Sequence, residues 1–279
     1  MNVTITEEDL QTATWIMGKP GEEDGIYITT SDIVVKYSRH VRGEREAKAI
    51  AFIRENCPRI PVPEVYGWWK GEKDIEHLAM SKMPGTLLSK TWDTMDSQQK
   101  ENVLKDLGEI LNDLRKIRAP SGVLIGPLDG GPAGDARAWG MEYGGPFKTE
   151  SEFNDWLISL IHPESMKFHS TFYYETIRNC LKSNHQLRFS HGDLGCHNIL
   201  VQDGRITGVI DWEFAGWYPE YWEYVKMIQF ERDPLIRCFG RECWKDEMGN
   251  QVFYDKEWVA DQILDSQVKN GSRVIKRPR

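Results

Sequence analysis

The pattern of apolar and polar positions divides the chain into a β-rich first third and a mostly helical remainder. Near the start, two runs rich in β-branched and aromatic residues, Gly25–Thr30 and Ile33–Tyr37, are separated only by Ser31 and Asp32. Short apolar runs joined by polar turn residues are typical of a β-hairpin. We therefore predict antiparallel strands in this part of the chain.

A helix is predicted over Glu44–Asn56. Glu46, Ile50 and Ile53 recur there at helical spacing and share one face. The prolines between residues 58 and 63 end this helix and force extended backbone.

Short strand-like pieces follow up to Met83, and the sequence Met83-Pro84-Gly85 is typical of a hinge. We predict a lobe boundary here. Residues 1–83 would form an N-terminal lobe with a sheet and one helix. Residues 84–279 would form a C-terminal lobe.

Beyond the hinge the apolar spacing is helical. An apolar stripe from Val103 to Ile117 predicts a long helix, which a capping-box-like pair, Asp96 and Gln99, opens. Further helices are predicted after Thr149 and near 163–183, 220–230 and 256–269, and strands near 187–190, 199–202 and 205–210. The dipeptide Asp203-Gly204 between the last two strands indicates a tight hairpin. The result is an α+β fold with a small β-rich lobe and a larger, mainly helical lobe.

Charge and composition narrow the function. The chain of 279 residues carries a net charge of −8, which does not favour binding to nucleic-acid phosphates or to anionic membranes. Its five cysteines are scattered without a C-x-x-C pair, and the first residues lack the basic and apolar regions of a signal peptide. No run of about eighteen apolar residues occurs. We therefore expect a cytoplasmic enzyme. The sequence indicates no particular oligomeric state.

The segment HGDLGCHNILV, followed by GVIDWE, concentrates polar residues suited to phosphoryl transfer. Asp193 and Asn198 are separated by four residues, and Asp211 ends the next β-run. Phosphoryl transfer needs a carboxylate that orients the acceptor hydroxyl and hard oxygen ligands for Mg²⁺. Asp193 suits the first task, and Asn198 with Asp211 suits the second. The alternative is an ordinary loop, in which Asp193 makes a turn and Asn198 caps a strand.

This stretch, continuing to GWYPEYWEYVK, resembles the aminoglycoside phosphotransferase-like family, which is related to choline-kinase-like enzymes. The segments IPVPEVYGWW, MSKMPGTLLSKTW and GGPFKTESEFNDWL look like its fungal branch. The resemblance implies a two-lobed protein-kinase-like fold, ATP and Mg²⁺ as cofactors, and a small-molecule acceptor. It also implies Asp193 as catalytic base and Asn198 and Asp211 as magnesium ligands. Cys196 departs from the proline often found at its position, and we expect that change to be neutral.

A zinc site is the competing interpretation of the same segment. His191, Cys196 and His197 could join Asp193 as ligands, but their spacing matches no usual zinc pattern. We expect His191 to pack and form hydrogen bonds within the catalytic loop instead.

Lys36 ends the apolar run of the second predicted strand. In kinases, a lysine on the third strand contacts the α- and β-phosphates of ATP. Glu46 lies ten residues on and faces inward, so we predict that it pairs with Lys36, with Glu44 as the second candidate. The alternative is that these are ordinary solvated charges.

The nucleotide-binding loop is less regular. No G-x-G-x-x-G motif occurs, and acidic residues intervene between Gly18, Gly21 and Gly25. The turn Thr29–Asp32 is a candidate to cover the phosphates instead. The segment with Met80, Ser81 and Met83 corresponds to the family's hinge, whose backbone contacts adenine.

An aromatic cluster lies between residues 212 and 224, and we interpret it mainly as core packing. Aromatic rings beside Glu213, Glu220 and Glu223 could also enclose a cationic acceptor. The favoured function is ATP-dependent phosphoryl transfer to a hydroxyl of an unidentified small molecule. The alternatives are a catalytically weak nucleotide-binding pseudokinase and a metal hydrolase that uses His191 and Asp193.

Overall fold

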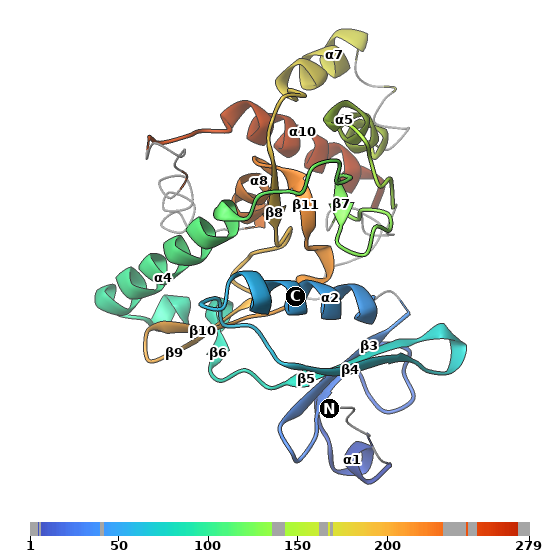
Figure 1. Ribbon diagram of the computed structural model, residues 1–279, viewed down its shortest axis with the longest axis vertical. Coiled ribbons are helices and arrows are strands. Elements are labelled where there is room, and N and C mark those ends of the chain that lie inside the picture. The colour runs from blue at the N-terminus through green and yellow to red at the C-terminus, as the bar shows by residue number, and fades with distance from the viewer. Residues whose placement is uncertain are drawn as a thin grey trace. The chain divides into compact units, whose positions relative to one another are not determined.

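The computed structural model describes residues 5, 7–39, 42–135, 143–161, 167, 170–230, 244 and 250–272. The chain packs as two compact units (Figure 1). Unit 1 contains Met1–Ile110 and Cys196–Glu213, and unit 2 contains Leu111–Gly195 and Phe214–Arg279. The lobe boundary predicted at residue 84 is a different division, and it stays a prediction.

Unit 1 is built on a five-stranded antiparallel sheet with the strand order β1-β2-β3-β5-β4. Its strands are β1 (Thr14–Met17), β2 (Gly25–Ile28), β3 (Ile33–Ser38), β4 (Val65–Lys70) and β5 (Glu76–Ser81). The predicted hairpin is confirmed as β2–β3, in which Gly25 pairs with Tyr37 and Ile26 with Lys36. Strand β1 was not predicted.

One helix covers this sheet. Helix α2 (Gly43–Asn56) packs against β4 and β5, and it matches the predicted Glu44–Asn56 to within one residue (Figure 1). Glu46, Ile50 and Ile53 are fully buried, as their shared face predicted. Two short helices, α1 (Glu7–Thr12) and η1 (Glu72–Asp74), complete this part.

A second sheet of unit 1 joins segments far apart in the sequence. Strand β6 (Thr86–Leu87) follows the predicted hinge and pairs with β9 (Ile199–Gln202), which in turn pairs with β10 (Arg205–Val209). The β9–β10 turn places Asp203 and Gly204 at φ of 51° and 70°. Two successive positive φ angles are typical of a type I′ hairpin turn, which explains the Asp-Gly sequence.

Three helical segments follow β6 along the chain: α3 (Leu88–Thr91), η2 (Trp92–Thr94) and α4 (Ser97–Lys116). The predicted capping box of α4 is present, because Asp96 and Gln99 exchange hydrogen bonds of 3.1 and 2.8 Å. Arg205 makes a bidentate ion pair with Asp106 on α4, at 2.7 and 2.8 Å. This contact fastens the β9–β10 hairpin to α4.

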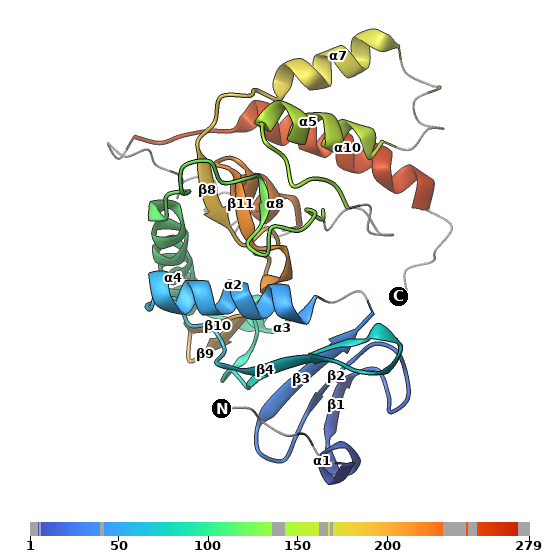
Figure 2. The same ribbon diagram turned by 45° about the vertical axis from the view of Figure 1, so that its right-hand side comes forward.

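Unit 2 is mainly helical (Figure 2). Its helices are α5 (Glu150–Ser159), α7 (Thr171–Cys180), α8 (Trp222–Phe230) and α10 (Asp255–Ser272). A small sheet of β7 (Gly126–Pro127), β11 (Gly216–Pro219) and β8 (Leu187–Ser190) lies among them. Thr149 and Glu152 form the capping box of α5.

Within the helix predicted over 163–183 the structure shows α7, and most of 162–169 lies outside the described residues. Five aromatic residues of β11, of α8 and of the turn between them are core residues, as expected, and are at most 5% exposed: Trp217, Tyr218, Tyr221, Trp222 and Tyr224. Every helix within the described ranges is too short or too polar to cross a bilayer.

Candidate active site

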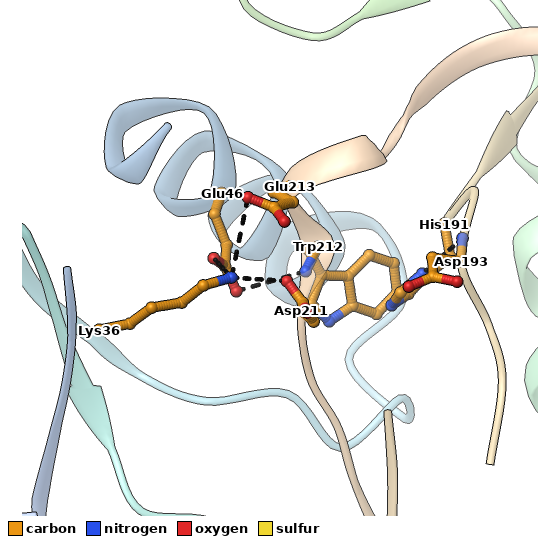
Figure 3. Close-up of polar contacts among 7 residues, drawn as sticks. All are labelled: Lys36, Glu46, His191, Asp193, Asp211, Trp212 and Glu213. Atoms are coloured by element: carbon orange, nitrogen blue, oxygen red, sulfur yellow. Dashed lines mark hydrogen bonds and ion pairs between the residues drawn. The ribbon is translucent and has the colours of Figure 1, made fainter. Parts of the chain in front are cut away.

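The ammonium group of Lys36 lies among three carboxylates in unit 1 (Figure 3). Its Nζ is 2.6 Å from Asp211 Oδ1, 3.1 Å from Glu46 Oε2 and 3.8 Å from Glu213 Oε2. Lys36 comes from β3, Glu46 from α2, and the other two from the segment after β10. The ion pair predicted between Lys36 and Glu46 is therefore present.

The second candidate partner, Glu44, is excluded. Glu44 points to the exposed side of α2, where it pairs with Lys48 at 2.9 Å. Glu46 is one half-turn further along the helix and faces the sheet, which is why only Glu46 reaches Lys36.

Burial and charge act in opposite directions on Lys36. Burial alone would lower the pKa of Lys36, but the carboxylates of Asp211, Glu46 and Glu213 outweigh it and hold the pKa well above its usual value. Lys36 is therefore positively charged at neutral pH although it is buried. A fixed, buried cation is suited to binding a polyanionic ligand such as a nucleoside triphosphate.

The β9–β10 hairpin brings Asn198 and Asp211 to its open end. Ile199 pairs with Val209, and the next residue outward, Ile210, donates its N–H to the Asn198 carbonyl at 3.0 Å. Asp211, the residue after Ile210, has φ of +68°. A non-glycine residue in this region is uncommon and is often found at functional sites.

The conformation of Asp211 is held from both sides. Trp212, fully buried, donates its backbone N–H to Glu46 Oε1 at 3.3 Å and its indole N–H to the Val209 carbonyl at 2.9 Å. Glu46 therefore has two roles, since one oxygen holds Lys36 and the other holds the backbone beside Asp211.

The donor atoms suit magnesium better than zinc. Asn198 and Asp211 offer oxygen ligands, and Mg²⁺ is commonly bound by one or two carboxylates together with substrate phosphates and water. Within the described residues no group of three or more His, Cys, Asp or Glu side chains could hold a metal ion. The zinc interpretation named His191, Cys196, His197 and Asp193, and these side chains form no such group among the described residues.

Asp193 belongs to unit 2, in the loop after β8. Its backbone N–H donates to His191 Nδ1 at 3.2 Å, and His191 is fully buried. His191 thus packs and forms a hydrogen bond within its own loop, as expected. Gly192 between them has φ of +83°, and a Cβ there would lie 3.0 Å from the Phe214 carbonyl oxygen, so the position favours glycine.

A family model described as "Phosphotransferase enzyme family" matches residues 21–241. The chain belongs to this family. It is therefore a kinase that uses ATP with Mg²⁺, as the sequence predicted.

Curated relatives agree with the family. The chain is 26% identical over 246 residues to an aminoglycoside 3'-phosphotransferase of Enterococcus faecalis, covering 85% of this chain and 83% of that protein. It is 26% identical over 248 residues to an enzyme of the same name from Staphylococcus aureus, covering 85% and 84%.

Solved structures show the fold. An aminoglycoside-3'-phosphotransferase of type VIII aligns with a TM-score of 0.60 at 16% identity, covering 91% of this chain and 93% of that one. The GDP and kanamycin complex of APH(2")-IIia aligns with a TM-score of 0.62 at 14% identity, covering 95% and 87%. The predicted α+β, two-lobed protein-kinase-like fold is thereby confirmed.

Sequence reasoning missed one contact of the loop that contains Asp193. Glu223 in α8 is buried, and its Oε2 accepts the backbone N–H groups of His191 and Gly192, the latter at 3.1 Å. Burial raises the pKa of Glu223 to about 7, against the lowering effect of these hydrogen bonds. Its carboxylate is committed to the loop before Asp193, so the cation-enclosing role considered for it is not supported. Its place in a first helical turn gave no sign of this contact.

The segment predicted to contact adenine contains Met80, Ser81 and Met83, and its first two residues lie in the sheet. Met80 and Ser81 end β5 and pair with Val34 and Ile33 of β3. The Ser81 N–H is already donated to the Glu64 carbonyl at 2.8 Å. Adenine contacts by these residues stay a prediction.

Strand β1 makes the glycine-containing segment before β2 a loop between two strands. The connection preceding β2 is the β1–β2 loop, residues 18–24, in which Gly18 and Gly21 have φ of 74° and 88°. It leads to the β2 residue that pairs with Tyr37, next to Lys36, whereas the turn Thr29–Asp32 lies at the other end of β3. The loop 18–24 is therefore the better candidate to cover phosphates at Lys36.

Proposed function

We propose that the kinase transfers the γ-phosphate of ATP to a hydroxyl group of a small molecule. The observation that carries this proposal is Lys36, a buried lysine held by Glu46 and by Asp211 from the end of the β9–β10 hairpin. A structural ion pair would need one carboxylate. Lys36 also contacts Asp211, which the resemblance implies is a magnesium ligand.

The residues of the site would then have the following tasks. Lys36 binds the phosphates, and Glu46 orients Lys36. Asn198 and Asp211 would hold Mg²⁺, which neutralises charge that develops on the transferring phosphoryl group. Asp193 would accept a hydrogen bond from the acceptor hydroxyl and take its proton as the new O–P bond forms. Glu223 would keep the Asp193 loop in place through the backbone of His191 and Gly192.

Adenine would be held by backbone groups at the end of β5. Because the Ser81 N–H is donated to Glu64, Met83 offers the better backbone contact. Solved relatives contain ADP and AMP-PNP in some cases and GDP in another. We propose ATP, and competition between ATP and GTP would test that choice.

The acceptor is a finer question. The curated relatives are named aminoglycoside 3'-phosphotransferases, and solved relatives bind hygromycin B, streptomycin or kanamycin. We propose aminoglycoside hydroxyls as the first acceptor class to test, followed by other hydroxylated metabolites, and we keep the cytoplasm as the expected location.

A second function, nucleotide binding with weak catalysis, is favoured by one observation. The loop 18–24 carries Glu22, Glu23 and Asp24, whose charges oppose phosphate. Glu23 is paired with Arg39 at 3.0 Å and contacts Lys73 at 3.6 Å, which offsets part of this charge.

The deciding experiment pairs wild-type protein with Asp193→Asn. Mass spectrometry would follow the ATP-dependent gain of one phosphate in an aminoglycoside and metabolite panel. Asn is nearly isosteric with Asp but cannot take a proton, so we expect turnover to fall about 10²–10⁴-fold. The thermal shift with MgATP should stay near the wild-type value, because nucleotide binding does not use Asp193. Equal turnover in both proteins would refute the base assignment, and MgATP binding without any product would favour the second function.

A further inference from the structure

The third carboxylate beside Lys36 has no task in the function proposed above. Glu213 belongs to the short helix η3 (Trp212–Phe214), and its Oε2 lies 3.8 Å from Lys36 Nζ. The Glu213 side chain is only 20% exposed, which is low for a glutamate and places its charge in the same partly water-excluded environment as the lysine. Figure 3 shows it approaching Nζ from a different direction than Glu46 and Asp211.

An ammonium group has three N–H donors, and here three carboxylates surround it. One ammonium group therefore faces three carboxyl groups. The shortest of these contacts, 2.6 Å, is made by Asp211, which is also the proposed magnesium ligand. Lys36 and Mg²⁺ therefore compete for one carboxylate, and binding of the metal would remove the strongest contact of Lys36.

What remains around Lys36 after that exchange decides where it can point. Glu46 alone would hold one side of the ammonium group, and the flexible four-carbon stem of lysine leaves other directions open. With Glu213 as a second ion-pair partner, two carboxylates stay beside the ammonium group, and the N–H donor that Asp211 releases can turn toward the phosphates.

We propose that Glu213 is a positioning residue that keeps Lys36 in its phosphate-binding orientation once Asp211 has turned to Mg²⁺. This inference rests on the proposed function, because it assumes that MgATP binds at Lys36.

The test compares MgATP affinity, measured by calorimetry, in wild-type protein, Glu213→Gln and Glu44→Gln. The glutamine variant keeps the size of the side chain and removes its charge. Glu44→Gln is the matched control, since it removes an exposed charge from α2 that pairs with Lys48 instead. We expect the Kd to rise about fivefold to tenfold for Glu213→Gln, as for one partly buried ion pair, and to stay unchanged for Glu44→Gln.

A double-mutant cycle separates positioning from metal binding. If Glu213 acts through Lys36, Glu213→Gln should have no further effect on the Kd in a Lys36→Met background. The Mg²⁺ concentration that half-saturates binding at fixed ATP should also stay unchanged. A loss of the same size in both backgrounds, or a raised half-saturating Mg²⁺ concentration, would show that Glu213 acts on the metal and would overturn the inference.

Two further outcomes are distinguishable. Equal MgATP affinity in wild-type protein and Glu213→Gln overturns this inference and leaves the proposed function intact. Wild-type protein that does not bind MgATP overturns the proposed function and this inference together. If Glu213→Gln fails to fold, Glu213→Asp serves instead, because it keeps the charge, shortens the reach and should give an intermediate Kd.

Discussion

Lys36 shows how a single residue can be read in the sequence and then explained by its surroundings. Substitution of Lys36 by Met keeps the aliphatic stem and removes the charge. We expect MgATP affinity or turnover to fall at least about tenfold, because the phosphates lose a fixed cation. Fold stability should fall as well, because the fully buried Glu46 carboxylate loses its ion-pair partner, so binding and turnover are compared per folded molecule. Calorimetry and urea unfolding measure the two effects. A collapsed melting temperature with normal turnover per folded molecule would make Lys36 structural.

Glu223 gives a pH-dependent prediction. Its pKa is raised from 4.5 to about 7 in the folded protein, so the native state binds a proton more tightly than the unfolded state between these values. The contribution of Glu223 to stability is therefore complete below about pH 4.5 and is lost as the pH rises through about 7. A shift of this size corresponds to about 3 kcal/mol.

The variant Glu223→Gln cannot titrate and isolates this effect. The difference in unfolding free energy between wild type and Glu223→Gln should change by about 3 kcal/mol between pH 5 and pH 8, to the disadvantage of the wild type at the higher pH. Urea unfolding at several pH values measures it. Parallel stability curves for the two proteins would show that Glu223 does not titrate in this range.

At the residue scale, the sequence predicted the ion pair of Lys36 with Glu46, because Glu46 faces inward at helical spacing. The tasks given to Asp193, Asn198 and Asp211 by their shared motif stay predictions. The sequence could not predict Glu223 or Glu213, because nothing in a helix-start pattern reveals that a carboxylate is buried or which backbone groups it meets. It also could not predict the positive φ of Asp211, which packing of Trp212 imposes.

At the scale of elements, periodicity predicted α2, α4 and the β9–β10 hairpin closely. Strand β1 was missed because three of its four residues are exposed or nearly so and no alternating pattern marks it. Because the sequence does not reveal β1, it points to the turn Thr29–Asp32 as the segment that covers the phosphates. An edge strand depends on its partner for stability, and a partner is not visible in local sequence.

The β9–β10 turn allows a test of an element. Gly204 has φ of +70°, and an added Cβ would lie 2.8 Å from Gln99 Cγ. Gly122 has nearly the same φ, +77°, with no atom within 4 Å of an added Cβ. Gly122→Ala should therefore cost only the backbone strain, about 1–2 kcal/mol, and Gly204→Ala should cost more by the contact with Gln99. Urea unfolding compares them, and equal losses would show that Gln99 moves aside freely.

At the scale of the whole molecule, the nucleotide should act on the folded state as a stabilising ligand. At a MgATP concentration of 100 times Kd, the stabilisation is about 2.7 kcal/mol, and for a chain of this size this raises the melting temperature by roughly 5–10 °C. ATP with EDTA should give a much smaller shift, because Asn198 and Asp211 would then have no cation to share with the phosphates.

The substitution Asp211→Asn makes this global effect depend on one carboxylate. Asn keeps an acceptor for Lys36 but removes the negative charge that a hard cation needs, so the MgATP shift should vanish. The fold itself should survive, because the contacts of Trp212 with Glu46 and Val209 do not use the Asp211 side chain. Asp193→Asn is the matched control, since it also converts an Asp of the proposed site to Asn and should keep the shift. A full MgATP shift in Asp211→Asn would remove Asp211 from the nucleotide site, and the partnership of Lys36 with Asp211 would then be purely structural.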